Sequence, residues 1–264
     1  MFSHNGMSGW RRIGLLLLIL VLAFVLATGC ATRHKDGGQA GADGSGSMEY
    51  DPSDAFLGQE VVDSAAHALE RMLESPDHAF LAETLPYARG VLLVPNYCKV
   101  SWIYGVGGGM GVFLGRAEDG SWSGPAFMQL AHAGVGFQAG VQRSTLVYVF
   151  LDESVVEAAL ESGFEFGAGA ELTVIGDVAH TGVSNRISER PVYLFAMSDG
   201  LWAGIALEGG VVDSRDGINQ AYYASPGISP REIVLGRAVS APDAGELVRL
   251  LSVEPAEDNV RILQ

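Results

Sequence analysis

Residues 91–115 read VLLVPNYCKVSWIYGVGGGMGVFLG, and this stretch carries the pattern that decides the fold. Short runs of Val, Leu, Ile, Tyr and Trp, which favour strands, are interrupted by glycine. No Gly-Lys-Ser/Thr follows the glycine cluster 105–111, and residues 112–114 favour a strand rather than the start of a helix. The sequence therefore predicts antiparallel strands and excludes a phosphate-binding loop.

The same pattern of short apolar runs and glycines continues to residue 212. Helical patterns occur before this region, within it and after it. Strands are predicted at 91–94, 100–104, 110–114, 126–133, 135–141, 145–151, 164–174, 192–198 and 201–212. Apolar residues spaced by three and four predict an amphipathic helix at 54–73, and shorter helices are predicted up to about 85 and at 153–161, 218–223 and 244–251. The predicted fold class is α+β, a mostly antiparallel, glycine-rich sheet with an N-terminal amphipathic helix and a few short helices.

Two segments of this region resemble each other. Residues 119–126 and 199–206 share the pattern Asp-Gly-x-Trp-x-Gly-x-Ala. Asp-Gly favours the positive φ angles of a type I′ turn, so we expect each segment to be a hairpin turn whose tryptophan begins the returning strand.

Composition excludes several classes of protein. The chain has 264 residues, 35 of them glycine without a collagen period, and a formal charge of −15. So acidic a chain with two lysines lacks the clustered cations of a nucleic-acid-binding protein. Two cysteines, Cys30 and Cys98, cannot form a disulfide framework, and the histidines lack the spacing of metal ligands.

The first thirty residues have the layout of a signal peptide. Arg11 and Arg12 precede an apolar run that ends in small residues before Cys30, and fifteen apolar residues are short for a membrane span. Residues 26–30, LATGC, resemble a bacterial lipobox, which implies cleavage before Cys30 and lipidation of its thiol and amine; an ordinary secretory signal is the alternative. Residues 1–29 are thus predicted to be a lipoprotein signal peptide, and 30–48 the lipidated cysteine and a flexible tether.

No motif of an enzyme is present. The segment 120–124 has tryptophan where a hydrolase elbow needs its serine, and carboxylate pairs lie beside helix starts and turns, where capping explains them. We predict no catalytic residue, no metal site and no cofactor.

Between residues 85 and 224 the sequence resembles the SYLF domain family, whose members bind lipid and, in eukaryotes, regulate actin. The resemblance rests on segments 88–91, 105–111, 120–126, 163–168 and 198–210, followed by Arg215, Asn219, Tyr222 and Tyr223. It implies a mostly antiparallel domain at 49–226, including the N-terminal helices, with a C-terminal extension at 227–264. It also implies membrane phospholipid as partner and a bacterial, envelope-located member, which would not meet actin.

Tryptophan prefers the boundary between polar and apolar phases, and cations pair with phosphate. The candidate lipid-binding residues are Lys99, Trp102, Arg116, Trp122, Trp202 and Arg215. Each has a simpler interpretation, because Trp122 and Trp202 can fill the core beside their hairpins and the cations can be solvated.

Two functions follow from these patterns. The first is a non-enzymatic lipoprotein with a phospholipid-binding domain in the bacterial cell envelope. Ala31 after the cysteine favours sorting to the periplasmic face of the outer membrane. The second is an envelope domain that binds a protein partner and touches the membrane only through the acyl anchor on Cys30, which the acidic charge favours.

Overall fold

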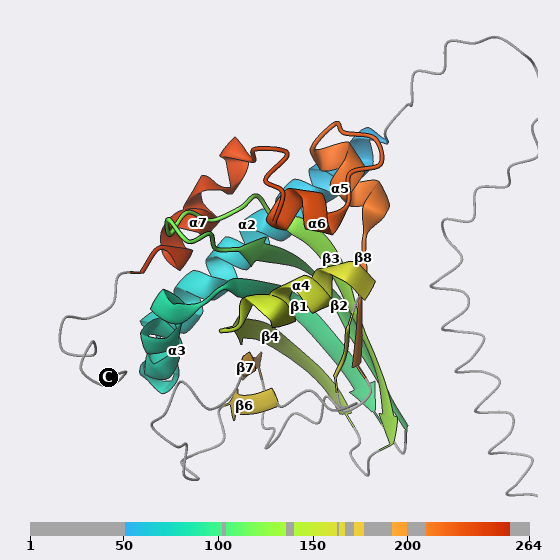
Figure 1. The fold of residues 1–264 in the computed structure, drawn as a ribbon. Helices are drawn as coiled ribbons and strands as arrows, with labels where there is room; N and C mark the ends of the chain where they lie inside the picture. The colour runs from blue at the N-terminus through green and yellow to red at the C-terminus, as the bar shows by residue number, and fades with distance from the viewer. Residues whose placement is uncertain are drawn as a thin grey trace, which may run out of the picture. The chain divides into compact units, whose positions relative to one another are not determined.

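A single eight-stranded sheet, in the order β5-β8-β3-β2-β1-β4-β7-β6, forms the centre of the fold (Figure 1). The computed structural model describes residues 51–101, 104–135, 140–162, 164–166, 172–176, 192–199 and 210–253. Seven neighbouring strands, from β5 to β7, pair antiparallel, and β6 lies parallel to β7 at one edge. The predicted class, α+β with a mostly antiparallel sheet, is confirmed.

The strands follow a simple route. They are β1 (Gly90–Ser101), β2 (Tyr104–Gly115), β3 (Ala126–Val135), β4 (Gly140–Phe150), β5 (Phe164–Phe166), β6 (Leu172–Gly176), β7 (Val192–Asp199) and β8 (Gly210–Ser214). The first three pair in sequence order, and β4 returns to the free side of β1. This is the strand order of a Greek key, which makes β1 and β2 the most central strands.

Helices surround the sheet. They are α2 (Pro52–Glu74), η1 (Pro76–His78), α3 (Ala79–Thr84), η2 (Leu85–Tyr87), α4 (Glu153–Ser162), α5 (Asp216–Tyr222), α6 (Pro230–Val234), η4 (Pro242–Ala244) and α7 (Gly245–Leu251). The Asp51 side chain caps α2 by accepting from the Ser53 amide at 2.9 Å, and Ser75 and Pro76 end the helix. Ser229 and Glu232 form a capping box at α6. The helices predicted at 54–73, 153–161, 218–223 and 244–251 are confirmed to within two residues.

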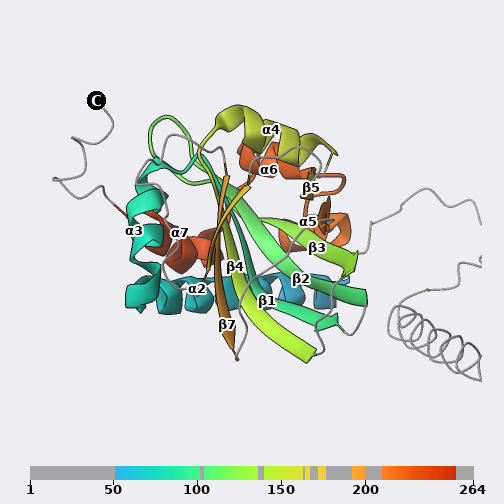
Figure 2. The ribbon, with the colours of Figure 1, turned by 90° about the horizontal axis from the view of Figure 1, so that it is seen from below.

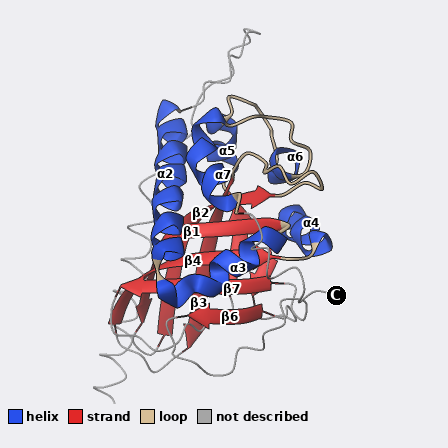
Figure 3. Cartoon of the chain, turned by 90° about the vertical axis from the view of Figure 1, so that its left-hand side faces the viewer, coloured by secondary structure: helices blue, strands red, loops and turns tan. Residues whose placement is uncertain are grey.

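The sheet has two buried faces. On one face, which we call the α2 face, α2 packs with α3, α5 and α7; α4 and α6 cover the other, the α4 face (Figures 2 and 3). Val91, Leu93 and Val112 belong to the core of the α2 face, and Leu92, Val94 and Phe113 to that of the α4 face. Segment 227–253 adds to both cores, with Leu247 and Leu251 on the α2 face and Ile233 and Val234 on the α4 face.

A β-bulge in β1 interrupts the alternation of its side chains. Val94 pairs with Leu146 and Tyr97 with Ser144, so the two residues of β1 between these pairs lie opposite a single residue of β4. Val94 and Tyr97 therefore both lie on the α4 face, whereas strict alternation would have placed them on opposite faces. Beyond the bulge, Lys99 shares the face of Tyr97, and Val100 faces the other way.

Beneath the bulge, β2 presents only glycine to the α4 face. A Cβ on Gly109 would lie 2.8 Å from Val94 Cγ1 and 3.0 Å from the carbonyl oxygen of Asn96. A Cβ on Gly107 would meet the Tyr97 hydroxyl at 2.5 Å. The glycine cluster of the sequence thus makes room for the bulged backbone of β1 and the ring of Tyr97.

This geometry corrects several boundaries predicted from the sequence. The strand predicted at 91–94 and the first two residues of the one predicted at 100–104 belong to one strand, β1, joined through the bulge. Tyr104 instead begins β2, which includes the glycines and the strand predicted at 110–114; residues 102 and 103 lie outside the described residues. In place of the single strand predicted at 164–174 the structure has two short strands, Phe164–Phe166 and Leu172–Gly176. The strand predicted at 135–141 spans the end of β3 and the start of β4. Residues 136–139 and 201–209 lie outside the described residues.

The turn between β2 and β3 differs from the expected type I′. Only Gly120 has a positive φ, of 85°, and its amide donates to the Ala117 carbonyl at 3.0 Å. Asp119 instead accepts from the Ser121 amide at 2.9 Å, so its side chain stabilises a type I turn followed by a left-handed glycine. The matching Gly200 lies outside the described residues.

Asn219 connects α5 to the start of β3. Its Oδ1 accepts from the Phe127 amide at 2.7 Å and its Nδ2 donates to the Phe127 carbonyl at 3.2 Å, while the side chain is fully buried. The amide thus pairs with both backbone groups of one strand residue, as a neighbouring strand would.

We predict that Gly111→Ala destabilises the domain. The added Cβ would lie 2.8 Å from Val94 Cγ2 and closer still to the Leu93 carbonyl oxygen, and backbone cannot give way as a side-chain end can. We expect a loss of about 2 kcal/mol in the free energy of unfolding, measured by urea denaturation. Gly245→Ala is the control, because nothing lies within 4 Å of its Cβ and alanine favours the helix. Equal urea midpoints for the two variants would contradict the crowding argument.

Asn219→Ala should also destabilise the domain, by about 2 kcal/mol, because it leaves the buried amide of Phe127 without its acceptor and removes one of the two donors to the Phe127 carbonyl. Asn219→Asp should lose stability as well, since a carboxylate cannot donate to the carbonyl. Chemical denaturation of both variants beside Asn96→Ala, whose residue is exposed, tests this. A tolerated aspartate would show that the donated hydrogen bond contributes little.

Candidate functional site

Two of the predicted lipid-binding residues, Arg116 and Trp122, lie together at the β2–β3 hairpin. They form an isolated β-bridge, and the guanidinium of Arg116 lies 5.9 Å from the centre of the Trp122 ring. Arg116 also donates to the Pro86 carbonyl at 2.6 Å and to the Gly120 carbonyl at 3.2 Å. Trp122 is only 8% exposed and belongs to the core of the α2 face. Both side chains are thus engaged in the structure of the hairpin.

Lys99 lies at the other end of the sheet and is 7% exposed. It pairs across β1 and β2 with Gly107, which pairs in turn with His132 of β3, 6% exposed. The side chains of Lys99 and His132 therefore flank a glycine on the α4 face, beside the Tyr97 hydroxyl. Burial lowers the pKa of Lys99 from its ordinary value. The structure does not bring Lys99 together with Arg116 and Trp122.

The remaining candidates are separated from both groups or are not described. Arg215 is exposed at the start of α5, and its amide donates to the Phe127 carbonyl at 3.0 Å. Trp102, Trp202 and Cys30 lie outside the described residues.

Exposed valines gather on the α2 face of the sheet, where the sequence analysis named no site. Val141 of β4, Val100 of β1 and Val106 of β2 stand side by side in register, followed by Ala133 of β3. One row further, Val211 of β8 pairs with Ala131. The four valines are 69%, 50%, 48% and 41% exposed, in that order. Among the described residues they are four of the five exposed large hydrophobic side chains; the fifth, Phe56, lies on α2.

These four valines, which we call the valine patch, occupy the ends of strands that α2 does not cover. Figure 1 shows β1 to β4 running past the helices. The patch could not be read from the sequence, because the bulge in β1 turns Val100 outward and residues from four separated strands compose it.

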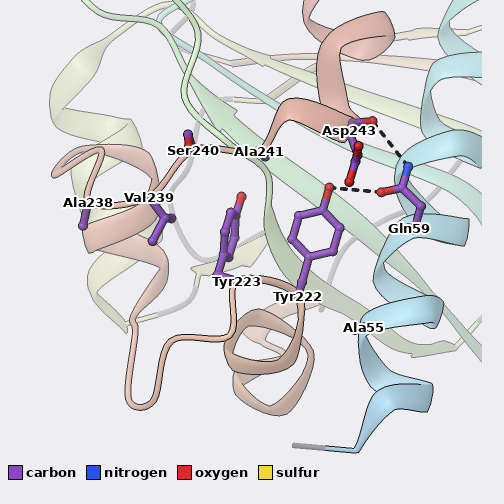
Figure 4. Close-up of a pocket in the computed structure, with 9 residues that line it drawn as sticks. All are labelled: Ala55, Gln59, Tyr222, Tyr223, Ala238, Val239, Ser240, Ala241 and Asp243. Carbon is purple, nitrogen blue, oxygen red and sulfur yellow. Dashed lines mark hydrogen bonds between the residues drawn. The ribbon is translucent and has the colours of Figure 1, made fainter.

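A cavity of about 570 Å³ lies at the opposite end of β3, between α2, the end of α5 and segment 238–243 (Figure 4). Tyr222 and Tyr223 line it with rings 5.0 Å apart and nearly perpendicular, at 84°. Gln59 of α2 accepts from the Tyr222 hydroxyl at 3.2 Å and donates to the carbonyl of Asp243 at 3.3 Å. We call this cavity the tyrosine pocket.

Carboxylates lie near the phenol group of Tyr222 in the tyrosine pocket. The pKa of Tyr222 is raised to about 12, first by burial and then by the carboxylates of Asp243 and Asp63. Burial also raises the pKa of Tyr223 well above its ordinary value, and its hydroxyl donates to the Pro125 carbonyl at 2.9 Å. Among the described residues, those that line the cavity include no lysine, arginine or histidine.

The described part of the chain offers neither a cluster of metal ligands nor a membrane-spanning helix. It contains no group of three or more His, Cys, Asp or Glu placed to hold a metal ion. Within the same residues, no helix is both long enough and apolar enough to span a bilayer.

Comparison with known proteins places the fold in a family. Residues 131–253 match the Ysc84 family, described as Las17-binding protein actin regulator. SH3 domain-containing YSC84-like protein 1 of Xenopus laevis is 32% identical over 180 residues, which cover 67% of this chain and 53% of that protein. The mouse protein of the same name is 32% identical over 181 residues, covering 67% of this chain and 52% of its own length.

A yeast relative is more distant. Protein YSC84 of Saccharomyces cerevisiae is 27% identical over 191 residues, covering 69% of this chain and 40% of its own. The matched part of the chain thus spans about half the length of the animal relatives and less of the yeast one. The chain belongs to the Ysc84/SYLF domain family, as a distant homologue of the SH3 domain-containing YSC84-like proteins and of yeast YSC84.

Proposed function

We propose that this protein is a non-enzymatic lipoprotein of the bacterial cell envelope, anchored through Cys30, whose Ysc84/SYLF domain binds phospholipid through the valine patch. The proposal is supported by the lipobox-like residues 26–30, by membership of a family linked to lipid binding, and by the exposed valines. The periplasmic face of the outer membrane is the proposed location, because alanine follows Cys30.

The observation that carries the lipid contact is a row of exposed apolar side chains on a sheet. Valines on well-paired strands are held in place before they meet a bilayer, so little conformational entropy is lost on contact. Moving a half-exposed valine into an apolar phase is worth about 1 kcal/mol, which makes four of them enough for reversible association.

Charge decides which kind of contact is possible. The chain carries a formal charge of −15, and loss of Arg11 and Arg12 with residues 1–29 would make it −17, so attraction to anionic head groups cannot dominate. One exposed cation, Arg143, pairs with Cys98 across β4 and β1 on the same face as the patch. We therefore propose a shallow, apolar contact with the membrane, with Arg143 near the level of the phosphates.

The alternative is a domain that binds an envelope protein and meets the membrane only through its anchor. The acidic charge favours it, and an apolar patch of this kind also suits a protein partner. The actin regulation named for the family stays with its eukaryotic members, because an exported bacterial protein would not meet actin.

We predict that residues 49–264, which include every described residue, co-sediment with phosphatidylcholine vesicles and that added salt leaves the bound fraction unchanged. Val141→Glu should lower that fraction at least about fivefold, because the carboxylate must be desolvated in the contact. Phe56→Glu is the matched control, since Phe56 is 66% exposed, close to the 69% of Val141, and both changes add one negative charge.

Three results separate the two functions. Binding that only Val141→Glu abolishes supports the lipid contact at the patch. Equal loss in Val141→Glu and Phe56→Glu would show a general effect of charge and overturn it. No binding to any vesicle would also overturn it and favour the protein partner, which size-exclusion of the domain with envelope extracts would then pursue.

We also predict that Cys30→Ser abolishes incorporation of radiolabelled palmitate by the full chain expressed in a bacterium, and moves the protein from the membrane to the soluble fraction. Cys98→Ser should change neither, because Cys98 lies within β1. Labelling that persists in Cys30→Ser would contradict lipidation at this cysteine.

A further inference from the structure

The tyrosine pocket has the composition of a site for an organic cation. Two tyrosine rings at right angles form one wall, with centres 5.0 Å apart, and the Asp243 side chain lies beside the Tyr222 hydroxyl (Figure 4). The described residues of the lining supply aromatic, carboxylate, amide and small apolar groups and no basic side chain. Aromatic faces with a nearby carboxylate are the surroundings that proteins use to bind ammonium groups.

We propose that the tyrosine pocket binds a primary or quaternary ammonium group, with Tyr222 and Tyr223 contacting the cation through their rings and Asp243 supplying the opposite charge. The group can belong to a lipid head group of the choline or ethanolamine class or to a free amine of the same chemistry. This site is independent of the valine patch, because it lies where Tyr222 packs on Phe127, at the opposite end of β3 from Ala133.

The surroundings of the pocket favour a cation over an anion. Asp63 holds Gln59 through a hydrogen bond of 2.8 Å, so a second carboxylate lies behind the lining. Both carboxylates disfavour ionisation of Tyr222, which is the response of a group placed in a negative potential. A phosphate in this cavity would meet two negative charges and no positive one among the lining residues.

The pocket is also prearranged for a ligand. Gln59 fixes the Tyr222 hydroxyl and the backbone of Asp243 at once, with contacts of 3.2 and 3.3 Å. The Tyr223 hydroxyl is held by the Pro125 carbonyl, so neither ring must find its orientation when a ligand arrives. The cavity of about 570 Å³ is large enough for an ammonium head group with part of its neighbouring chain.

The test is calorimetric titration of the full chain, purified in a neutral maltoside detergent, with choline chloride and with ethanolamine hydrochloride. Titration with 3,3-dimethyl-1-butanol, which has the shape of choline without its charge, measures how much of the binding depends on the cation. We expect choline to bind and the neutral alcohol to bind at least about tenfold more weakly. Equal affinity for choline and the alcohol would overturn the proposal, as would absence of heat with both amines and with the vesicles below.

Variants locate the site. Asp243→Asn removes the charge without removing the backbone carbonyl that Gln59 contacts, and should weaken choline binding at least about fivefold. Asp77→Asn is the matched control, because it removes one exposed carboxylate from η1, outside the pocket. Tyr222→Phe keeps the ring and should retain binding, whereas Tyr222→Leu should lose it. Equal affinity in Asp243→Asn and Asp77→Asn would overturn the assignment to this pocket.

A second arm distinguishes the source of the ammonium group. Residues 49–264 carrying Val141→Glu, which lack the proposed contact of the valine patch, are titrated with vesicles of phosphatidylcholine and of phosphatidylglycerol. If phosphatidylcholine vesicles bind the Val141→Glu variant but do not bind the double variant Val141→Glu/Asp243→Asn, the ammonium group belongs to a lipid head group. Choline binding with no response to either vesicle identifies a free amine. If Val141→Glu does not reduce vesicle binding while the tyrosine pocket is unchanged, that result counts against the valine patch and leaves the proposal for the pocket standing.

Discussion

The close approach of β1 to β2 is the constraint on which the rest of the sheet depends. At the bulge, the backbone of β1 and the ring of Tyr97 lie against the part of β2, residues 105–111, that has only glycine on that face. A side chain at Gly107, Gly109 or Gly111 would occupy space already filled, and at each of the three positions a backbone oxygen of β1 lies within 3.1 Å of the added Cβ. Glycine has a poor intrinsic preference for strands, so its concentration in β2 is explained by this contact rather than by local propensity.

The bulge also determines which residues are buried at that end of the sheet. By turning the alternation of β1 over, it sends Lys99 to the α4 face and Val100 to the α2 face. The neighbouring strands have no such shift between Val141 and Leu146 or between Val106 and Val112, so Val100 comes level with Val141 and Val106. One extra residue thus explains both a buried lysine and an exposed row of valines.

The helix α2 and the strand β1 show what could and could not be predicted from the sequence. The helix predicted at 54–73 has a continuous period of apolar residues, from Val61 to Met72, and was found almost to the residue. In contrast, Pro95 and Asn96 interrupt the strand period, so β1 was predicted as two strands and the faces beyond the bulge could not be assigned. Arg116 and Trp122 were predicted as lipid contacts from their residue type, and only the hydrogen bonds of the folded hairpin show that both are engaged there.

The two proposed sites of the domain differ because different parts of the chain form them. The valine patch requires the pairing of five strands, β4, β1, β2, β3 and β8, and the tyrosine pocket requires α2, α5 and segment 238–243 to meet at Gln59. Neither set is contiguous, so residue type alone could not have indicated them. Their charges differ too: the patch has Arg143 at its border, whereas the pocket has Asp243 and Asp63. In the proposed contact, an acidic chain that met a membrane through uncharged valines would keep its carboxylates in water, and the carboxylates of Asp243 and Asp63 would make the pocket suitable for a cation.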